Sequence, residues 1–103
     1  MPNSKLAKFF QPESVAIIGA TPKEGKVGRA ILENFIAKFK GRIYPVNPNY
    51  SEILGLKCYR SVKDIPETPD LGVIAIPAPQ VPEVVRELGE KGTKAVIIIS
   101  GGF

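Results

Sequence analysis

A glycine-rich turn after the first apolar run holds the residues best suited to bind a ligand. Gly19 follows that run, and Gly25 and Gly28 lie at the start of a stretch with helical spacing. Glycines let a backbone turn tightly and approach a ligand, and the free N–H groups of a helix start attract an anion. With Lys26 beside it, the turn predicts a phosphate-bearing nucleotide ligand. A glycine-rich connector with solvated Lys23 and Lys26 is the alternative interpretation.

The spacing of this turn argues against two familiar nucleotide sites. A P-loop requires G-x-x-x-x-G-K-[ST], but five residues separate Gly19 from Gly25, and Val27 offers no hydroxyl to Mg²⁺. A dinucleotide fold places an acid about 20 residues further on, against the ribose. The second strand-like run ends instead at Asn47. CoA carries a phosphate on that ribose, which a carboxylate would repel, so the missing acid counts against NAD and is compatible with CoA.

Four strand-like runs alternate with two helical patterns and would position this turn. The strands are expected at 14–18, 42–46, 71–76 and 94–99, and the helices at 27–40 and 81–91. Such alternation predicts right-handed crossovers and an α/β fold, a Rossmann-like doubly wound parallel sheet of about four to five strands with helices on both faces. Because residues 1–103 stop just after a strand, we expect one truncated domain from a longer chain.

Local signals refine these elements. Gly41 and Gly92 follow the two helices as C-terminal cap glycines do. Ser61 is expected to cap a one-turn helix, and residues 4–10 to form a short leading helix. In the second helix, Val81, Val84, Val85 and Leu88 form the expected buried face.

The carboxyl ends of the other strands are the expected neighbours of the ligand. Pro77 and Pro79 would form a stiff wall suited to an adenine face or a pantetheine arm, or would simply stop a strand and start a helix. Tyr50 either contacts the ligand or packs under the loop. Cys58 is expected to be a structural thiol, because no general base is recognisable beside it.

Composition excludes several classes of function. The net charge of +4 is spread over scattered lysines and arginines, unlike a nucleic-acid surface. No apolar run approaches the roughly 18 residues that span a membrane. A single cysteine allows no internal disulfide and favours a reducing, cytoplasmic compartment. The absence of histidine excludes histidine catalysis and phosphohistidine chemistry in this chain. With one cysteine and no histidine, no zinc or other metal site is expected.

Taken in order, these features resemble the ADP-forming acyl-CoA synthetases, in particular the acetyl-CoA synthetase (acetate–CoA ligase) branch. The resemblance covers nearly the whole chain, from about Leu6 to Phe103. The stretches that carry it are 10–20, 25–28, 44–48, 55–59, 61–62, 75–79 and 96–103. Succinyl-CoA synthetase α subunits share the layout more distantly.

The resemblance implies a parent enzyme that interconverts acyl-CoA, ADP and phosphate with acid, CoA and ATP through an acyl-phosphate and a phosphohistidine. This domain would hold CoA or acyl-CoA and would not be catalytic alone. ADP, ATP and Mg²⁺ would bind only in the parent enzyme. The implied partners are the remaining domains or a β subunit, in an oligomer.

The same resemblance implies which residues meet each part of CoA. The phosphates would lie at Gly19, Ala20, Thr21, Lys26, Val27 and Gly28. The adenosine would lie near Asn47, Pro48 and Tyr50, and the arm along Ile76, Pro77 and Ala78. Ser100 and Gly101 would approach the thiol end.

Two other functions stay open on the sequence. One is a non-catalytic, CoA-sensing regulatory module, because some bacterial protein acetyltransferases resemble this architecture. The other is the NAD-binding domain of a dehydrogenase or redox sensor, against which Asn47 counts.

Overall fold

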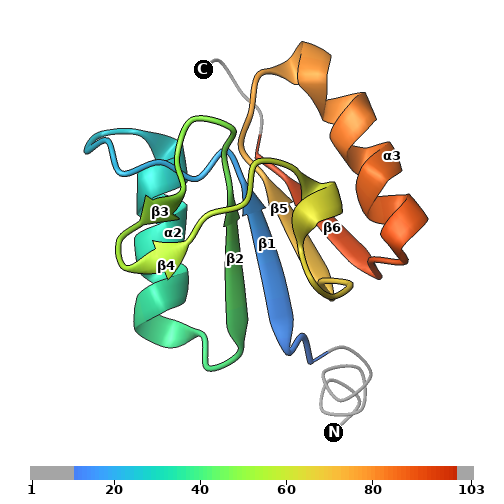
Figure 1. The fold of residues 1–103 in the computed structure, drawn as a ribbon, viewed down its shortest axis with the longest axis horizontal. Helices are drawn as coiled ribbons and strands as arrows, with labels where there is room; N and C mark the ends of the chain where they lie inside the picture. The colour runs from blue at the N-terminus through green and yellow to red at the C-terminus, as the bar shows by residue number, and fades with distance from the viewer. Residues whose placement is uncertain (1–10, 100–103) are drawn as a thin grey trace, which may run out of the picture.

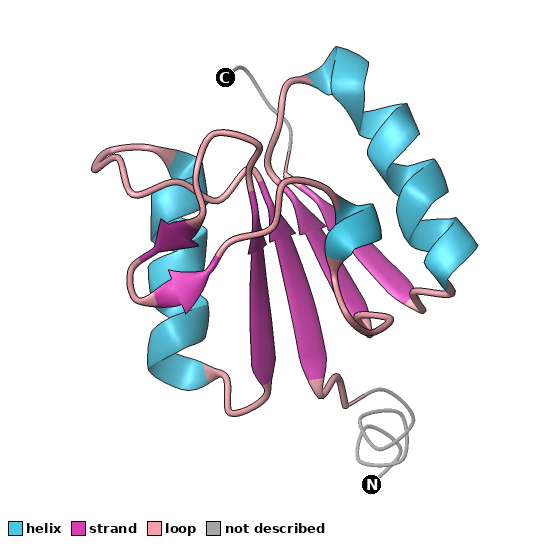
Figure 2. Ribbon diagram, viewed as in Figure 1, coloured by secondary structure: helices cyan, strands magenta, loops and turns pink. Residues whose placement is uncertain are grey.

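The computed structural model describes residues 11–99, which form a four-stranded parallel sheet between two layers (Figures 1 and 2). The strands are β1 (Ser14–Ile18), β2 (Arg42–Val46), β5 (Leu71–Ile74) and β6 (Ala95–Ile98), in the order β2-β1-β5-β6. Every pairing is parallel. The predicted fold class is therefore confirmed. The strands at β5 and β6 are shorter than the predicted runs of 71–76 and 94–99.

Side chains that alternate along the central strand build a core on each face of the sheet. Val15 and Ile17 pack on the side of α2 (Val27–Lys38), where the hairpin of β3 (Glu52–Ile53) and β4 (Leu56–Lys57) also packs. Ala16 and Ile18 pack on the side of α3 (Val81–Lys91). A strand buried on both faces must be apolar throughout, as the β1 run is.

Helix α3 follows its predicted bounds and is well capped. Pro82 lies in its first turn, and Gly92 ends it in the left-handed conformation, with φ of 95°. The helix approaches the sheet through Leu88, which lies so close to Gly72 that a Cβ added there would be 2.6 Å from the leucine side chain. Val81 and Val84 are half-buried beside Leu88. Val85 was expected to be buried and is instead exposed.

Helix α2 ends earlier than predicted, at Lys38 rather than at Lys40. Its C-cap is Phe39, whose N–H donates to the carbonyl oxygen of Phe35 at 2.8 Å. The prediction that Gly41 caps this helix is therefore wrong. Gly41 is required by a close approach instead: a Cβ there would lie 2.2 Å from the carbonyl oxygen of Glu13.

The long connection from β2 to β5 contains no full helix. It forms the β3–β4 hairpin and then the one-turn 3-10 helix η1 (Val62–Asp64). As predicted, Ser61 caps η1, with its side chain accepting a hydrogen bond from the N–H of Lys63 at 3.2 Å. The predicted leading helix at 4–10 lies outside the described residues.

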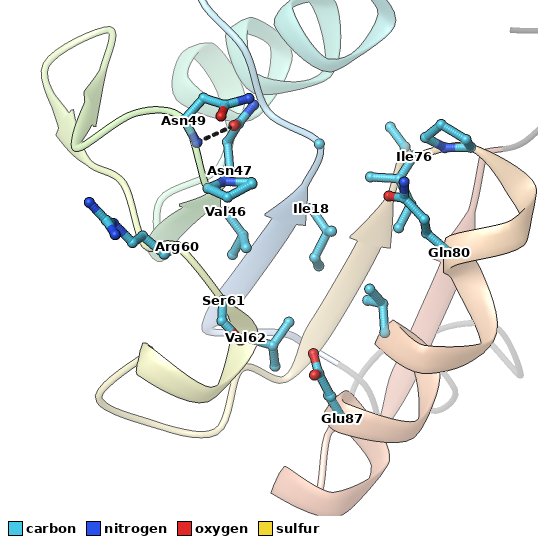
Figure 3. Close-up of a pocket in the computed structure, with 15 residues that line it drawn as sticks. Ile18, Val46, Asn47, Asn49, Arg60, Ser61, Val62, Ile76, Gln80 and Glu87 are labelled. Atoms are coloured by element: carbon cyan, nitrogen blue, oxygen red, sulfur yellow. Dashed lines mark hydrogen bonds between the residues drawn. The ribbon is translucent and has the colours of Figure 1, made fainter.

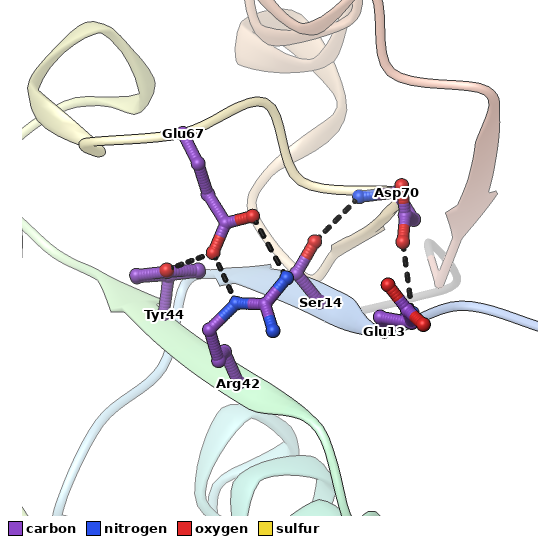
Figure 4. A network of polar contacts seen from close by, with 6 residues as sticks. All are labelled: Glu13, Ser14, Arg42, Tyr44, Glu67 and Asp70. Atoms are coloured by element: carbon purple, nitrogen blue, oxygen red, sulfur yellow. Dashed lines mark hydrogen bonds and ion pairs between the residues drawn. The ribbon is translucent and has the colours of Figure 1, made fainter.

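A polar network closes the amino end of the sheet (Figure 4). The Arg42 guanidinium pairs with both carboxylate oxygens of Glu67, and the Tyr44 hydroxyl donates to the same carboxylate. Nearby, the buried Ser14 hydroxyl accepts from the N–H of Asp70 at 2.9 Å. These contacts fasten the segment before β5 to β1 and β2, at the end of the sheet opposite the glycine turn.

Candidate functional site

A cavity of about 480 Å³ opens at the carboxyl ends of β1, β2 and β5 (Figure 3). After β1 the chain passes to α2 on one face of the sheet, and after β5 it passes to α3 on the other. The crevice between these two strand ends is the switch point of the topology, where open parallel sheets bind ligands. The cavity therefore lies where the fold predicts a ligand.

Gly19 joins the three strand ends at the rim of this cavity. Its φ is 95°, a conformation that favours glycine. Its N–H donates to the carbonyl oxygen of Val46 at 3.0 Å. A Cβ on Gly19 would lie 2.2 Å from the carbonyl oxygen of Ala75, at the end of β5. Any side chain here would push the strand ends apart, so the rim is made of bare backbone.

Gly28 brings the start of α2 against the same turn. A Cβ at this position would lie 1.9 Å from the Gly19 carbonyl oxygen. The start of α2 therefore packs so closely on the turn after β1 that only a residue without a side chain fits at position 28. The first turn of α2 contains no acidic residue, and its N-cap, Lys26, makes no side-chain capping bond. The helix start therefore presents a positive potential, and no carboxylate within the first turn of α2 offsets it.

Asn47 ties the glycine turn to the end of β2. Its side-chain amide donates to the carbonyl oxygen of Ala20 at 2.8 Å, and its side-chain oxygen accepts from the N–H of Asn49 at 2.8 Å. An aspartate could not make the first of these bonds, because a carboxylate has no N–H to donate. Asparagine at this position thus has a structural role, since it joins the end of β2 to the glycine turn.

The structure brings five of the predicted site residues together around the cavity. They are Gly19, Asn47, Pro48, Ile76 and Pro77. They come from the ends of three different strands, as expected of a site at this edge of the sheet.

The other predicted residues of the glycine turn lie beside the cavity but do not line it. Ala20 is fully buried behind the rim. The Thr21 hydroxyl accepts from the N–H of Lys23 at 3.2 Å, within the turn. Lys26 and Val27 line a separate surface hollow at the start of α2, together with Arg29.

Four further predicted residues do not line the cavity in the part of the chain that the structure describes. Tyr50 is half-buried and packs against the core on the α2 side of the sheet. Ala78 is exposed in the short 3-10 helix η2 (Ala78–Gln80). Ser100 and Gly101 lie outside the described residues.

Several residues that line the cavity were not predicted. Arg60 and Ser61 come from the connection before η1, and Gln80, Val84 and Glu87 from η2 and α3. Glu87 could have been found in the sequence, because it lies three residues after Val84 and directly before Leu88, within the apolar stripe of α3. A carboxylate in such a stripe is unusual and marks a candidate site residue.

Cys58 behaves as a structural residue beneath this edge. Only 5% of it is exposed, and burial raises the pKa of its thiol. The Sγ atom donates to the carbonyl oxygen of Asn47 at 3.5 Å. A buried thiol held in its protonated form is a poor nucleophile, which agrees with the structural role expected for Cys58.

Two classes of feature are missing from the part of the chain that the structure describes. Residues 11–99 contain no group of three or more His, Cys, Asp or Glu side chains that could hold a metal ion. None of the helices within that range has the length and apolar character needed to cross a membrane.

Comparison with known proteins identifies relatives of this architecture. A family model described as a CoA binding domain matches residues 13–103. An ADP-forming acetate–CoA ligase of Methanocaldococcus jannaschii is 54% identical over 99 residues, which are 96% of this chain and 14% of that protein. The α subunit of ADP-forming acetate–CoA ligase I from Pyrococcus furiosus is 48% identical over 103 residues, covering 95% of this chain and 22% of the subunit.

A solved structure gives the same result in three dimensions. Acetyl-coenzyme A synthetase 1 of Candidatus Korarchaeum cryptofilum, described as dinucleotide-forming and solved with phosphate and ADP, superimposes with a TM-score of 0.86 and 39% identity. The match covers 95% of this chain and 21% of that one. The chain thus spans about a fifth or less of the length of these relatives.

Proposed function

This chain belongs to the CoA binding domain family, and we propose that it holds coenzyme A in the cavity at the carboxyl edge of its sheet. The observation that carries the proposal is the contact of Gly19 with Ala75 and Gly28, which leaves a rim of bare backbone at the start of α2. A pyrophosphate can approach such a rim closely and interact with the positive end of the helix.

The end of β2 supports CoA over a dinucleotide. Asn47 occupies the position where a dinucleotide-binding fold places a ribose-binding acid, and its side chain is bonded to Ala20 and Asn49. A neutral residue there does not repel the phosphate on the CoA ribose. In this proposal the ribose lies near Asn47 and Pro48, and the arm passes Ile76 and Pro77.

We further propose that the chain is the CoA-holding part of an ADP-forming acid–CoA ligase. The relatives that are acetate–CoA ligases support this reading. Their reaction converts acetyl-CoA, ADP and phosphate into acetate, CoA and ATP. The sequence contains no histidine, so a phosphohistidine would have to come from another domain or subunit. The ADP and Mg²⁺ sites would likewise lie in another domain or subunit. The proposal includes a cytoplasmic location, because a single cysteine favours a reducing compartment.

A thermal-shift comparison of CoA, dephospho-CoA, NAD and ATP tests the binding function. CoA should raise the melting temperature, and ligand at 100 times its Kd should add about 2.7 kcal/mol of stability. NAD should have little effect, because Asn47 stands where a dinucleotide-binding fold has an acid that binds the ribose. The chain alone should produce no acetyl-CoA from acetate, CoA and ATP. Stabilisation by NAD and not by CoA would refute the proposal.

A further inference from the structure

Glu87 is the one carboxylate among the described residues that line the cavity. Helix α3 places it on the inner face, and only 14% of its side chain is exposed. Figure 3 shows its carboxylate directed toward Val62, at the end of the cavity away from Asn47 and Ile76. A carboxylate largely removed from water is costly unless it finds partners, so its position requires an explanation.

The contacts within residues 11–99 leave this carboxylate with acceptor capacity. Its ion pair is with Lys63, at 3.9 Å, and the lysine side chain is 67% exposed. Water and salt screen so long and exposed a pair. No hydrogen bond to the Glu87 side chain occurs among the described residues, although an ionised carboxylate can accept about four.

The charge of Glu87 would also orient a nucleotide bound in the cavity. A carboxylate repels phosphate, so the phosphates belong at the other end, beside Gly19 and the start of α2. Between the two ends, apolar side chains form much of the walls: Ile18, Val46, Val62, Ile76 and Val84. The lining also includes the polar side chains of Arg60, Ser61 and Gln80. Apolar walls with a polar group at one end suit a planar base that carries a hydrogen-bond donor at its edge.

We propose that Glu87 accepts a hydrogen bond from the exocyclic amino group of the adenine of bound CoA, and so selects adenine over a base with a carbonyl at that position. The inference rests on the proposed CoA-binding function and adds the residue that recognises the base. Hypoxanthine tests it, because it replaces the amino group by a carbonyl oxygen that Glu87 would repel and moves the nearest donor to the ring N1.

The experiment measures by calorimetry the affinity of the chain for CoA and for desamino-CoA, which carries hypoxanthine in place of adenine. Wild type should bind CoA about 10- to 100-fold more tightly, the range expected for a hydrogen bond to a charged group. In Glu87→Gln the ratio should fall to about threefold or less, because a glutamine amide can also donate to the hypoxanthine oxygen.

Glu90→Gln is the matched control, since Glu90 lies on the same helix, is exposed and pairs with Arg86 at 2.7 Å. It should keep the wild-type ratio. Equal affinity of wild type for the two ligands, or an unchanged ratio in a folded Glu87→Gln variant, overturns the role of Glu87 while CoA binding stands. Absence of CoA binding in wild type overturns the proposed function and the inference with it. The wild-type ratio decides the matter if Glu87→Gln does not fold.

Discussion

Replacing Gly28 by alanine separates two opposite expectations for the same position. Gly28 lies in the first turn of α2, where helix propensity alone favours alanine by about 1 kcal/mol. The structure opposes the change, because the added Cβ would lie 1.9 Å from the Gly19 carbonyl oxygen. The atom it meets is backbone, which cannot rotate away as a side chain can.

The size of the effect follows from this contact. The start of α2 would have to move away by about 1 Å or more to restore ordinary contact distances. Overpacking of this kind costs about 1–3 kcal/mol, and more where backbone must shift. We expect Gly28→Ala to lower the free energy of unfolding by about 2 kcal/mol, and the melting temperature by about 10 °C. CoA binding should weaken as well, since the displaced helix start faces the proposed phosphate position.

Gly89→Ala is the matched control for this variant. Gly89 is also a helical glycine, in α3, but a Cβ there meets nothing within 4 Å. Its replacement should raise the free energy of unfolding by up to about 1 kcal/mol. Urea denaturation followed by circular dichroism, with CoA titration of each variant, measures both effects. A Gly28→Ala variant as stable as wild type and with intact CoA affinity would refute the close-packing argument.

Two further variants test charges at opposite ends of the sheet. Lys26→Ala should weaken CoA binding by about 1 kcal/mol, because Lys26 is an exposed charge at the N-cap of α2. The effect should be smaller at high salt, which screens such a charge. Calorimetry with Lys23→Ala as control checks this, and equal affinities of the variants and wild type would assign the site to backbone amides. At the other end, the hydrogen bond from Arg42, followed by that from Tyr44, lowers the pKa of the Glu67 carboxyl. Its contribution to stability is therefore present above the unfolded pKa of about 4.3 and is lost as pH falls through the lower folded pKa. Glu67→Gln should lower the melting temperature by a few degrees at pH 7. On acidification the melting temperature of the variant should fall less than that of wild type. Identical pH profiles for variant and wild type would contradict this.

Patterns local in sequence were sufficient to predict the fold. The β1 run is apolar at every position from Val15 to Ile18 because both faces of the strand are covered. Pro82 and Gly92 mark the bounds of α3 through their own backbone preferences. Gly41 shows where this reasoning fails. It follows a helix as a capping glycine would, yet it is needed because the distant Glu13 carbonyl lies against it.

The path of the connection between β2 and β5 explains most of what the sequence could not predict about the site. Tyr50 lies at the start of this connection, which turns into the β3–β4 hairpin and carries the tyrosine to the α2 side of the sheet. The same connection returns on the other side and brings Arg60 and Ser61 to the cavity. No periodic pattern fixes such a path, because it depends on packing with residues far along the chain.

The residues of this site divide by the kind of information that specifies them. Gly19 and Gly28 act through the absence of a side chain, and each is recognisable from its place between a strand and a helix. Glu87 is proposed to act through its charge; its place in the apolar stripe of α3 is visible in the sequence, but the cavity that α3 and η1 form around it is not. The first group sets how closely the strand ends and α2 approach, so its variants should change stability and binding together. Within the protein Glu87 makes one long ion pair, with the exposed Lys63, so its replacement should change ligand preference with little effect on stability. A chain in which Gly28→Ala altered ligand preference alone, or Glu87→Gln altered stability alone, would not follow this division.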